Sequence, residues 1–361
     1  MVTDSTHPGR YWHAIKGQPG RIQCDLCPCH CRLKPGQRGA CFVRRNLDGQ
    51  MVLTTYGRSS GFCIDPIEKK PLNHFLPGTP VLSFGTAGCN LTCAFCQNWD
   101  ISKSREMDRL MDSASPEALA DAARIHGCPS VAFTYNDPVI FLEYAVDTAI
   151  ACRKRGIHPV AVTAGYIEEE PCKEFFDHMD AANVDLKAFT DTFYREICGA
   201  ELSPVLETLE YIRHHTDCWL ELTTLLIPGK NDSDDELTAM CNWVVEALGP
   251  DVPMHFTAFH PDFRMRDIPY TPEDTLLRAR KIALAAGVKF AYTGNIPNET
   301  TNSTTCPGCN KRVIGRITYT LTDWELDRNG ACRHCGTPIP GRFDPVPGDW
   351  GTRRQPIRLH T

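Results

Sequence analysis

Three cysteines stand close together in the stretch GCNLTCAFCQNW, which spans residues 88–99. They are Cys89, Cys93 and Cys96, separated by three residues and then by two. Structural zinc and ordinary iron–sulfur clusters favour four protein ligands, but this stretch offers three. Three thiolates can hold three irons of a [4Fe–4S] cube and leave the fourth iron open to a substrate. The alternative is a structural metal loop whose fourth ligand lies far away in the sequence.

Two further groups of cysteines have the spacing of metal sites. Near the C-terminus, 22 residues separate two C-x2-C pairs, and a β-hairpin is expected around 318–320 between them. Four thiolates in this spacing suit tetrahedral zinc, as in a zinc ribbon, with an auxiliary iron–sulfur cluster as the second possibility. Both interpretations also apply near the N-terminus, where an auxiliary cluster would matter for electron supply and zinc would be structural. The predicted ligands are Cys306, Cys309, Cys332 and Cys335 in the first group and Cys24, Cys27, Cys31 and Cys41 in the second, with Cys29 and His30 as spares.

Composition limits the class of protein. The 361 residues are 42% hydrophobic and 23% charged, as in soluble globular proteins, and the net charge of −6 argues against nucleic-acid binding through bulk charge. No apolar run approaches the ~20 residues that cross a bilayer, and residues 1–17 lack the pattern of a secretory signal. We therefore expect a cytoplasmic protein without a membrane or nucleic-acid partner. In that reducing compartment, the 19 cysteines are not expected to form structural disulfides.

Strand-like and helical patterns alternate from about residue 80, which predicts an α/β fold with a parallel sheet. Ser115 and Pro116 provide a start signal for one helix, and Gly127 provides its end. Six such units fit a partial (β/α)6 barrel of the TIM type with small cysteine-rich metal-binding segments at both termini, and a doubly wound sheet is the alternative. The expected strands are 81–85, 130–135, 159–165, 183–189, 219–227 and 254–259, with a possible seventh at 288–294. The expected domains are 1–76, 77–298 and 299–361.

The loop of three cysteines follows the first expected strand, and active sites of parallel sheets lie at the carboxyl ends of the strands. Its C-x3-C-x2-C spacing resembles the signature of the radical S-adenosylmethionine superfamily. Over nearly its whole length, the chain is similar to the AmmeMemoRadiSam-system radical enzymes, relatives of the pyruvate formate-lyase activating enzymes. The other matching stretches are DPIEKKPLNHF (65–75), FTYNDP (133–138), VDLKAF (184–189), LTTLLIPGKND (222–232) and FHPDFRM (259–265).

The resemblance implies an enzyme, an oxidoreductase that uses a [4Fe–4S] cluster and S-adenosylmethionine. In such enzymes, reductive cleavage of S-adenosylmethionine releases a 5′-deoxyadenosyl radical, which abstracts hydrogen from a second substrate. That substrate is expected to be a protein or peptide, and an electron donor such as flavodoxin or ferredoxin is implied. The alternatives are a small-molecule substrate or a non-catalytic iron–sulfur or zinc adaptor.

The resemblance also assigns residues to S-adenosylmethionine. Phe95 would pack near the adenine. Asn136 and Asp137 lie in the segment that meets the amino group, although the family usually has Glu at the acidic position and Asp137 also suits a helix N-cap. Asp185 and Lys187 are two apart on an expected strand, so they should project from one face. There they would meet the zwitterionic head of S-adenosylmethionine, and a plain salt bridge is the alternative.

Overall fold

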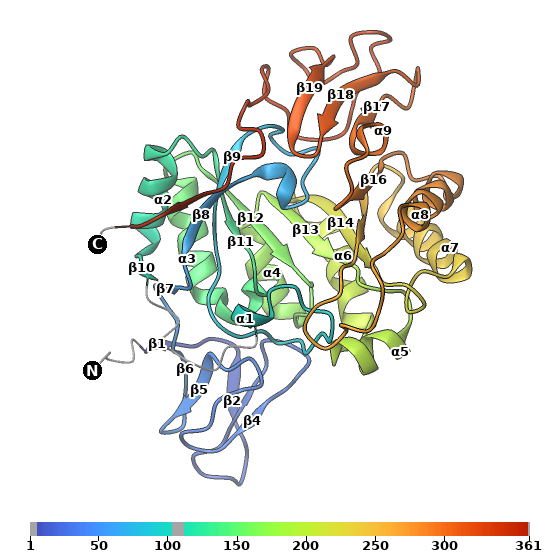
Figure 1. Ribbon diagram of the computed structural model, residues 1–361. Helices are drawn as coiled ribbons and strands as arrows, with labels where there is room; N and C mark the ends of the chain where they lie inside the picture. The colour runs from blue at the N-terminus through green and yellow to red at the C-terminus, as the bar shows by residue number, and fades with distance from the viewer. Residues whose placement is uncertain (1–5, 103–111, 360–361) are drawn as a thin grey trace.

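The computed structural model describes residues 6–102 and 112–359. At its centre is a nine-stranded sheet with the order β16-β15-β14-β13-β12-β11-β9-β8-β20 (Figure 1). The strands from β9 to β16 run parallel, and β8 and β20 add antiparallel at one edge. The strands are β8 Phe62–Pro66, β9 Pro80–Phe84, β11 Ser130–Phe133, β12 His158–Thr163, β13 Ala181–Asp185, β14 Trp219–Leu226, β15 Met254–Ala258, β16 Ala291–Gly294 and β20 Gln355–Ile357.

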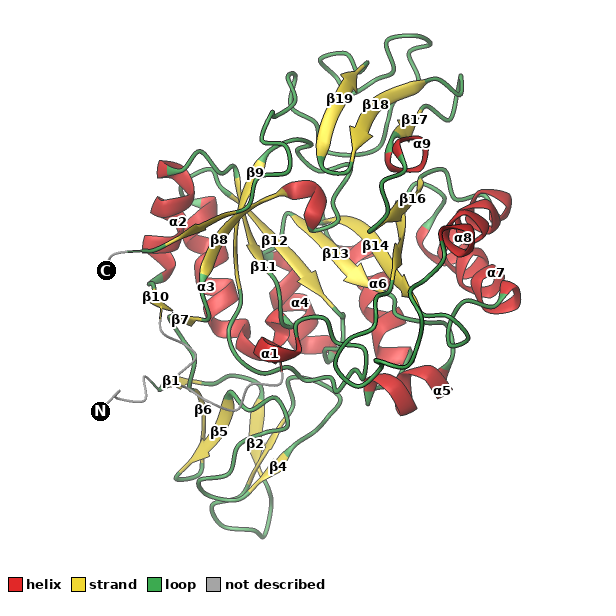
Figure 2. Ribbon diagram, in the orientation of Figure 1, coloured by secondary structure: helices red, strands yellow, loops and turns green. Residues whose placement is uncertain are grey.

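A row of helices accompanies the sheet, from α2 at one side to α8 at the other (Figure 2). Local signals fix their starts: the Ser115 side chain accepts a hydrogen bond from the Ala118 amide at the start of α2, and Ser233 caps α7 through the Glu236 amide. No helix of the described residues has both the length and the apolar character needed to cross a membrane. The main helices are α2 Pro116–Ile125, α3 Leu142–Arg153, α4 Glu169–Asp177, α6 Ser203–His215, α7 Asp234–Trp243 and α8 Glu273–Ala286.

The predicted α/β architecture is confirmed: all six expected strands form, and the possible seventh forms as β16. In the described residues, β16 and β20 stand at the two edges of the sheet, so it stays open. The expected strand 183–189 is wrong in its second half, because β13 ends at Asp185. The Leu186 amide bonds to the Val184 carbonyl, and the Lys187 amide donates to the Tyr194 hydroxyl, so this backbone leaves the ladder.

The two cysteine-rich ends of the chain lie at opposite ends of the sheet (Figure 1). The N-terminal strands lie near the ends to which β12 and β13 point, and the C-terminal strands lie at the amino ends. The expected domain boundaries stay a prediction, and β8 and β20, from the flanking segments, join the central sheet. The N-terminal strands are β1 His7–Pro8, β2 Trp12–Ala14, β3 Ile22–Cys24, β4 Arg32–Leu33, β5 Arg44–Leu47 and β6 Gln50–Leu53, and the C-terminal strands are β17 Thr304–Thr305, β18 Arg312–Ile317 and β19 Thr320–Trp324.

The shorter elements connect these parts of the chain. The C-terminal hairpin of β18 and β19 turns at 318–319, as expected. The remaining elements are β7 Arg58–Ser59, β10 Asp112–Ser113, α1 Trp99–Ser102, α5 Asp191–Phe193, α9 Glu299–Asn302, the 3-10 turns η1 Ile67–Lys69 and η3 Pro138–Phe141, and the π turns η4 Tyr194–Cys198 and η5 Val244–Leu248.

A buried carboxylate fastens the segment between β8 and β9 to the sheet. Glu221 on β14 is fully buried and accepts hydrogen bonds from the backbone amides of Asn73 and His74, at 3.0 and 2.7 Å. It also accepts from Trp219 Nε1 and pairs with His255 Nε2, at 3.0 and 2.7 Å. Burial alone would raise the pKa of Glu221, but the His255 hydrogen bond and charge bring it below the ordinary value. The carboxylate therefore stays ionised and joins three parts of the fold.

We predict that Glu221→Ala destabilises the protein strongly. Removal of the carboxylate leaves several buried donors unpaired, and each unsatisfied donor costs about 1–3 kcal/mol, so a loss of at least about 3 kcal/mol is expected. Urea denaturation should show a fall of that size in the free energy of unfolding. Glu210→Ala, an exposed position on α6, is the control and should change it little. Equal stability of the two variants would contradict the prediction.

Candidate active site

The three-cysteine loop, residues 88–99, is tied to the end of a neighbouring strand. The buried Asn136 side chain, beyond β11, donates from Nδ2 to the Gly88 carbonyl at 2.8 Å and accepts at Oδ1 from the Thr86 amide at 3.0 Å. On the other side, a Cβ added at Gly88 would overlap the carbonyl oxygen of Cys41. Gly88 also has φ of +85°, a conformation that favours glycine. The loop is thus held between β11 and the N-terminal segment.

The middle of the loop pairs with the backbone of η4. The Thr92 amide donates to the Cys198 carbonyl at 2.8 Å, and the Ala94 amide donates to the Ile197 carbonyl at 2.9 Å. These bonds hold the stretch that joins Cys89 to Cys96.

The thiols of the loop suit an iron–sulfur cube better than a single zinc ion. A tetrahedral zinc ion with Zn–S bonds near 2.3 Å brings sulfurs to about 3.8 Å from each other. Among the described residues, the loop thiols do not form a group whose ligand atoms all lie within 4.8 Å. A cube holds its thiolates farther apart, because irons and sulfides lie between them.

A charged pair lies beside the loop. Lys187 Nζ is 2.7 Å from Asp185 Oδ2, and the Lys187 side chain is 12% exposed while that of Asp185 is 38% exposed. Burial alone would lower the pKa of Lys187, but the Asp185 carboxylate and the Cys93 thiol raise it well above its usual value. The ammonium also lies 5.9 Å from the centre of the buried Phe95 ring. Lys187 is therefore a permanent cation next to the cysteine loop.

Asp137 caps η3 and binds the end of β12. Its Oδ1 accepts from the Val139 amide at 3.1 Å and from the Thr163 hydroxyl at 2.9 Å, and its Oδ2 accepts from the Ala164 amide at 2.8 Å. Burial raises the pKa of Asp137, while these hydrogen bonds act in the opposite direction. The expected N-cap is therefore confirmed. A carboxylate has about four acceptor sites, so the fold leaves capacity for roughly one more donor on Oδ2.

The end of the cysteine loop is covered by the connection from β15 to α8. Gln97 Nε2 lies 2.8 Å from His260 Nδ1, and Trp99 Nε1 donates to Asp262 Oδ1 at 3.1 Å. The Trp99 ring also stacks on Phe263, with ring centres 5.7 Å apart. The FHPDFRM stretch therefore acts as a support for the loop.

A charged cluster that the sequence alone did not single out lies near β8. The buried Asp65 carboxylate contacts Lys69 and Lys70 at 2.9 and 2.7 Å and accepts from the Tyr135 hydroxyl at 2.7 Å. Burial lowers the pKa of Lys70 to about 8, although Asp65 beside it acts in the opposite direction. Two of the matching stretches, DPIEKKPLNHF and FTYNDP, meet here. Tyr135 has φ of +72°, which no sequence pattern reveals.

The four C-terminal cysteines converge on one point. The Cys306 and Cys335 sulfurs are 3.6 Å apart, and those of Cys309 and Cys332 are 3.8 Å apart. All four sulfurs lie within 4.8 Å of one another, as tetrahedral zinc requires. Hydrogen bonds from Thr337 lower the pKa of Cys335 to about 6, which favours the thiolate. The structure therefore brings the predicted set together in the form of a metal site.

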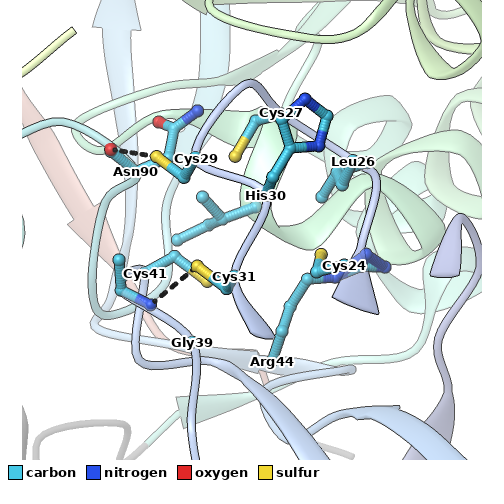
Figure 3. Close-up of a pocket in the computed structure, with 12 residues that line it drawn as sticks. Cys24, Leu26, Cys27, Cys29, His30, Cys31, Gly39, Cys41, Arg44 and Asn90 are labelled. Carbon is cyan, nitrogen blue, oxygen red and sulfur yellow. Dashed lines mark hydrogen bonds between the residues drawn. The ribbon is translucent and has the colours of Figure 1, made fainter. Parts of the chain in front are cut away.

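The N-terminal cysteines line a cavity beside the three-cysteine loop (Figure 3). The loop contributes Asn90 to the wall, and the Cys29 thiol donates to the Asn90 carbonyl at 3.4 Å. The predicted ligands that face this cavity are Cys24, Cys27, Cys31 and Cys41.

Comparison with known proteins identifies the family. Residues 84–241 match the model of the radical SAM superfamily. An uncharacterized protein of Methanocaldococcus jannaschii is 39% identical over 320 residues, which cover 88% of this chain and 95% of that protein. The chain belongs to the radical SAM superfamily. This radical SAM protein is also similar to the pyruvate formate-lyase 1-activating enzyme of Escherichia coli, at 24% identity over 168 residues. That match covers 44% of this chain and 65% of the enzyme, which is less than two thirds of its length.

Among solved structures, a radical SAM methyltransferase from Sphaerobacter thermophilus aligns with a TM-score of 0.47 and 14% identity. The alignment covers 80% of this chain and 76% of that chain. Membership in the radical SAM superfamily implies a [4Fe–4S] cluster and S-adenosylmethionine as cofactors. The loop of this radical SAM protein fits that cluster. It offers three thiols at the carboxyl end of β9, and in the described residues they are not gathered as closely as the ligands of a single zinc ion.

We predict that Gly88→Ala destabilises the protein more than the same substitution does at another glycine with a left-handed backbone. Gly127 is the matched control, because it has φ of +66° but open space around its Cα. Both variants should lose about 1–2 kcal/mol to the left-handed backbone. Gly88→Ala should lose clearly more, because its methyl group overlaps the Cys41 carbonyl. Thermal unfolding without metal measures both, and equal shifts would contradict the close contact.

Proposed function

We propose that this radical SAM protein cleaves S-adenosylmethionine reductively and removes hydrogen from a protein or peptide, as an oxidoreductase related to the activating enzymes. The observation that carries the proposal is the juxtaposition of the three-cysteine loop with the Asp185–Lys187 pair at the carboxyl end of the sheet. When bound, the cluster and S-adenosylmethionine supply the electron and the 5′-deoxyadenosyl radical. The chain's own residues bind and orient them.

The proposed roles follow from charge and position. Cys89, Cys93 and Cys96 hold three irons of the cluster. Lys187 offers an ammonium to the carboxylate of S-adenosylmethionine, and the half-exposed carboxylate of Asp185 offers an acceptor to its amino group.

Three further residues complete the proposed site. Phe95, beside Lys187, gives the adenine an apolar surface. Asp137 has capacity for roughly one more donor, so it can meet the amino group while it caps η3. Asn136 positions the loop through Gly88 and Thr86, which is the role its hydrogen bonds favour.

A protein or peptide substrate is favoured by two features. The similar enzyme of Escherichia coli is named for activating pyruvate formate-lyase 1, which is itself a protein. The sheet also stays open between β16 and β20 in the described residues, and an open edge gives a chain segment a way in. A seventh strand makes this opening narrower than six strands would. We further propose that a one-electron donor such as flavodoxin or ferredoxin supplies the reducing electron.

The cysteine loop gives the direct test of the proposed activity. After anaerobic reconstitution, the wild-type chain should convert S-adenosylmethionine to 5′-deoxyadenosine in the presence of a reductant. Cys89→Ala, Cys93→Ala and Cys96→Ala should each abolish that product, because each thiolate holds one iron. Cys128→Ala, a buried cysteine away from the loop, is the control and should retain it. Full activity in any loop variant would refute the assignment.

Label transfer distinguishes the kinds of substrate in the same assay. A fully deuterated protein partner should pass deuterium into 5′-deoxyadenosine, and the altered residue should appear in the partner's peptide map. Label that arrives from a deuterated metabolite, with every protein partner absent, would favour a small-molecule substrate.

We predict that Asp185→Asn and Lys187→Ala weaken S-adenosylmethionine binding while the cluster remains. Loss of a charge-assisted hydrogen bond costs ~1.5–3 kcal/mol, or roughly ten- to a hundredfold in affinity. Calorimetry on the reconstituted protein gives the affinity, and iron analysis gives the cluster content. Lys289→Ala is the control, since Lys289 forms a surface pair with Asp251 at 2.8 Å. Unchanged affinity in both variants would make the pair a purely structural salt bridge.

The C-terminal set, by our proposal, holds structural zinc in a zinc ribbon. The supporting observation is the sulfur spacing of 3.6 and 3.8 Å. We predict that Cys306→Ala and Cys332→Ala remove about one zinc per chain and lower the melting temperature, because structural zinc contributes on the order of 10 kcal/mol to folding. Metal analysis of the full chain and of both variants measures this. Loss of iron instead of zinc in the variants would overturn the proposal.

A further inference from the structure

The cavity formed by the N-terminal cysteines has no part in the proposed cleavage of S-adenosylmethionine. Cys24 ends β3, Cys27 and Cys29 follow on the next loop, Cys31 precedes β4, and Cys41 precedes β5. Figure 3 shows their sulfur atoms around a common space, with Arg44 at its side. The loops and strand ends around β3, β4 and β5 thus bring five thiols to one place.

All five thiols lie close enough to act on one another. The Cys24 and Cys27 thiols act on both Cys31 and Cys41. Thiolates so close together repel one another unless a cation binds between them. Cys29 also interacts with Cys27, and its sulfur donates in addition to the Asn90 carbonyl at 3.4 Å.

A buried cation faces the same cavity and points to an anionic occupant. Arg44 is 1% exposed, and it pairs with Glu143 and donates to the Arg10 carbonyl. Its Nε has no hydrogen-bond partner in the described part of the chain. An unpaired buried donor of this kind is costly. Glu143 already balances the charge of Arg44, but the sulfur atoms of a metal centre held by four thiolates would offer an acceptor to the unpaired Nε.

The spacing of the thiols separates a cluster from zinc. Among the described residues, the C-terminal set is the group that brings its sulfurs within 4.8 Å of one another. The N-terminal thiols, like those of the radical SAM loop, include no group of three that meets this limit in the described part of the chain. We infer that Cys24, Cys27, Cys31 and Cys41 hold a second [4Fe–4S] cluster, which has all four irons bound by the protein.

This cluster lies directly against the active site. The Cys41 carbonyl packs on Gly88, and Cys29 contacts Asn90, so the cysteine segment touches the loop that carries Cys89 at two points. The C-terminal set, by contrast, lies at the amino ends of the strands (Figure 1). Binding of this second cluster does not require cleavage of S-adenosylmethionine, so it can be tested independently of the proposed function.

The test removes the first cluster and counts the iron that remains. The full chain with Cys89, Cys93 and Cys96 all changed to Ala is reconstituted anaerobically with iron and sulfide. We expect about four irons per chain to remain, as one [4Fe–4S] cluster requires. After reduction, the electron paramagnetic resonance spectrum should show such a cluster. Addition of Cys27→Ser or Cys41→Ser to this variant should remove both the iron and the signal.

Cys29→Ser in the same background is the matched control, and it should keep the iron, since serine can still donate to the Asn90 carbonyl. A triple variant without iron and with about two zinc ions per chain, one for each terminal set, would overturn the inference. Loss of iron in Cys29→Ser but not in Cys27→Ser would overturn the ligand assignment. Because the first measurement needs no change in the N-terminal segment, misfolding of Cys27→Ser would not affect it. The 5′-deoxyadenosine assay on the wild-type chain tests the proposed function separately.

Discussion

The contact between Gly88 and the Cys41 carbonyl sets how the three-cysteine loop lies against the N-terminal segment, because no side chain fits between the two backbones. On one side of this contact, the loop of three cysteines is fixed to β11 by Asn136. On the other side, Cys41 belongs to a segment whose own shape is held by the buried Arg44–Glu143 pair, and Glu143 lies on α3. The N-terminal segment is therefore part of the wall of the candidate active site.

The two terminal cysteine sets differ in surroundings as well as in spacing. The C-terminal set packs into a small hydrophobic cluster with Phe290 and Tyr292, at the start of β16. There, His74 joins the Tyr292 hydroxyl to the Pro340 carbonyl, both at 2.6 Å, and so links the sheet to the C-terminal strands. This is the arrangement of a structural support. The N-terminal set instead adjoins the main core and the three-cysteine loop, so the proposed second cluster would lie beside the candidate active site.

Sequence reasoning found the strands because buried parallel strands are short apolar runs, and it found the metal sets because thiol spacing is local. It misplaced the end of β13. Burial alternates from Val184 to Ala188, so the two-residue period continues after the ladder has ended. The hydrogen bonds at Lys187, where the ladder has ended, involve Tyr194, seven residues on, and Asn231, 44 residues on, and neither pairing follows a local pattern. For the same reason, the Arg44–Glu143 pair and the contact of Cys41 with Gly88 could not be predicted.

Because the backbone leaves β13 after Asp185, the Asp185 and Lys187 side chains are positioned differently from those of a regular strand. On a regular strand, both side chains would stand on one face with their backbones committed to neighbouring strands. Here the Lys187 carbonyl accepts from Asn231 and its amide donates to Tyr194, so side chains fix its position instead. The ammonium is thereby held near Phe95 and Cys93, while Asp185 keeps an exposed carboxylate at the rim. A largely buried cation beside the cysteine loop and an accessible anion beside it form a charge pattern that suits the zwitterionic ligand of the proposed function.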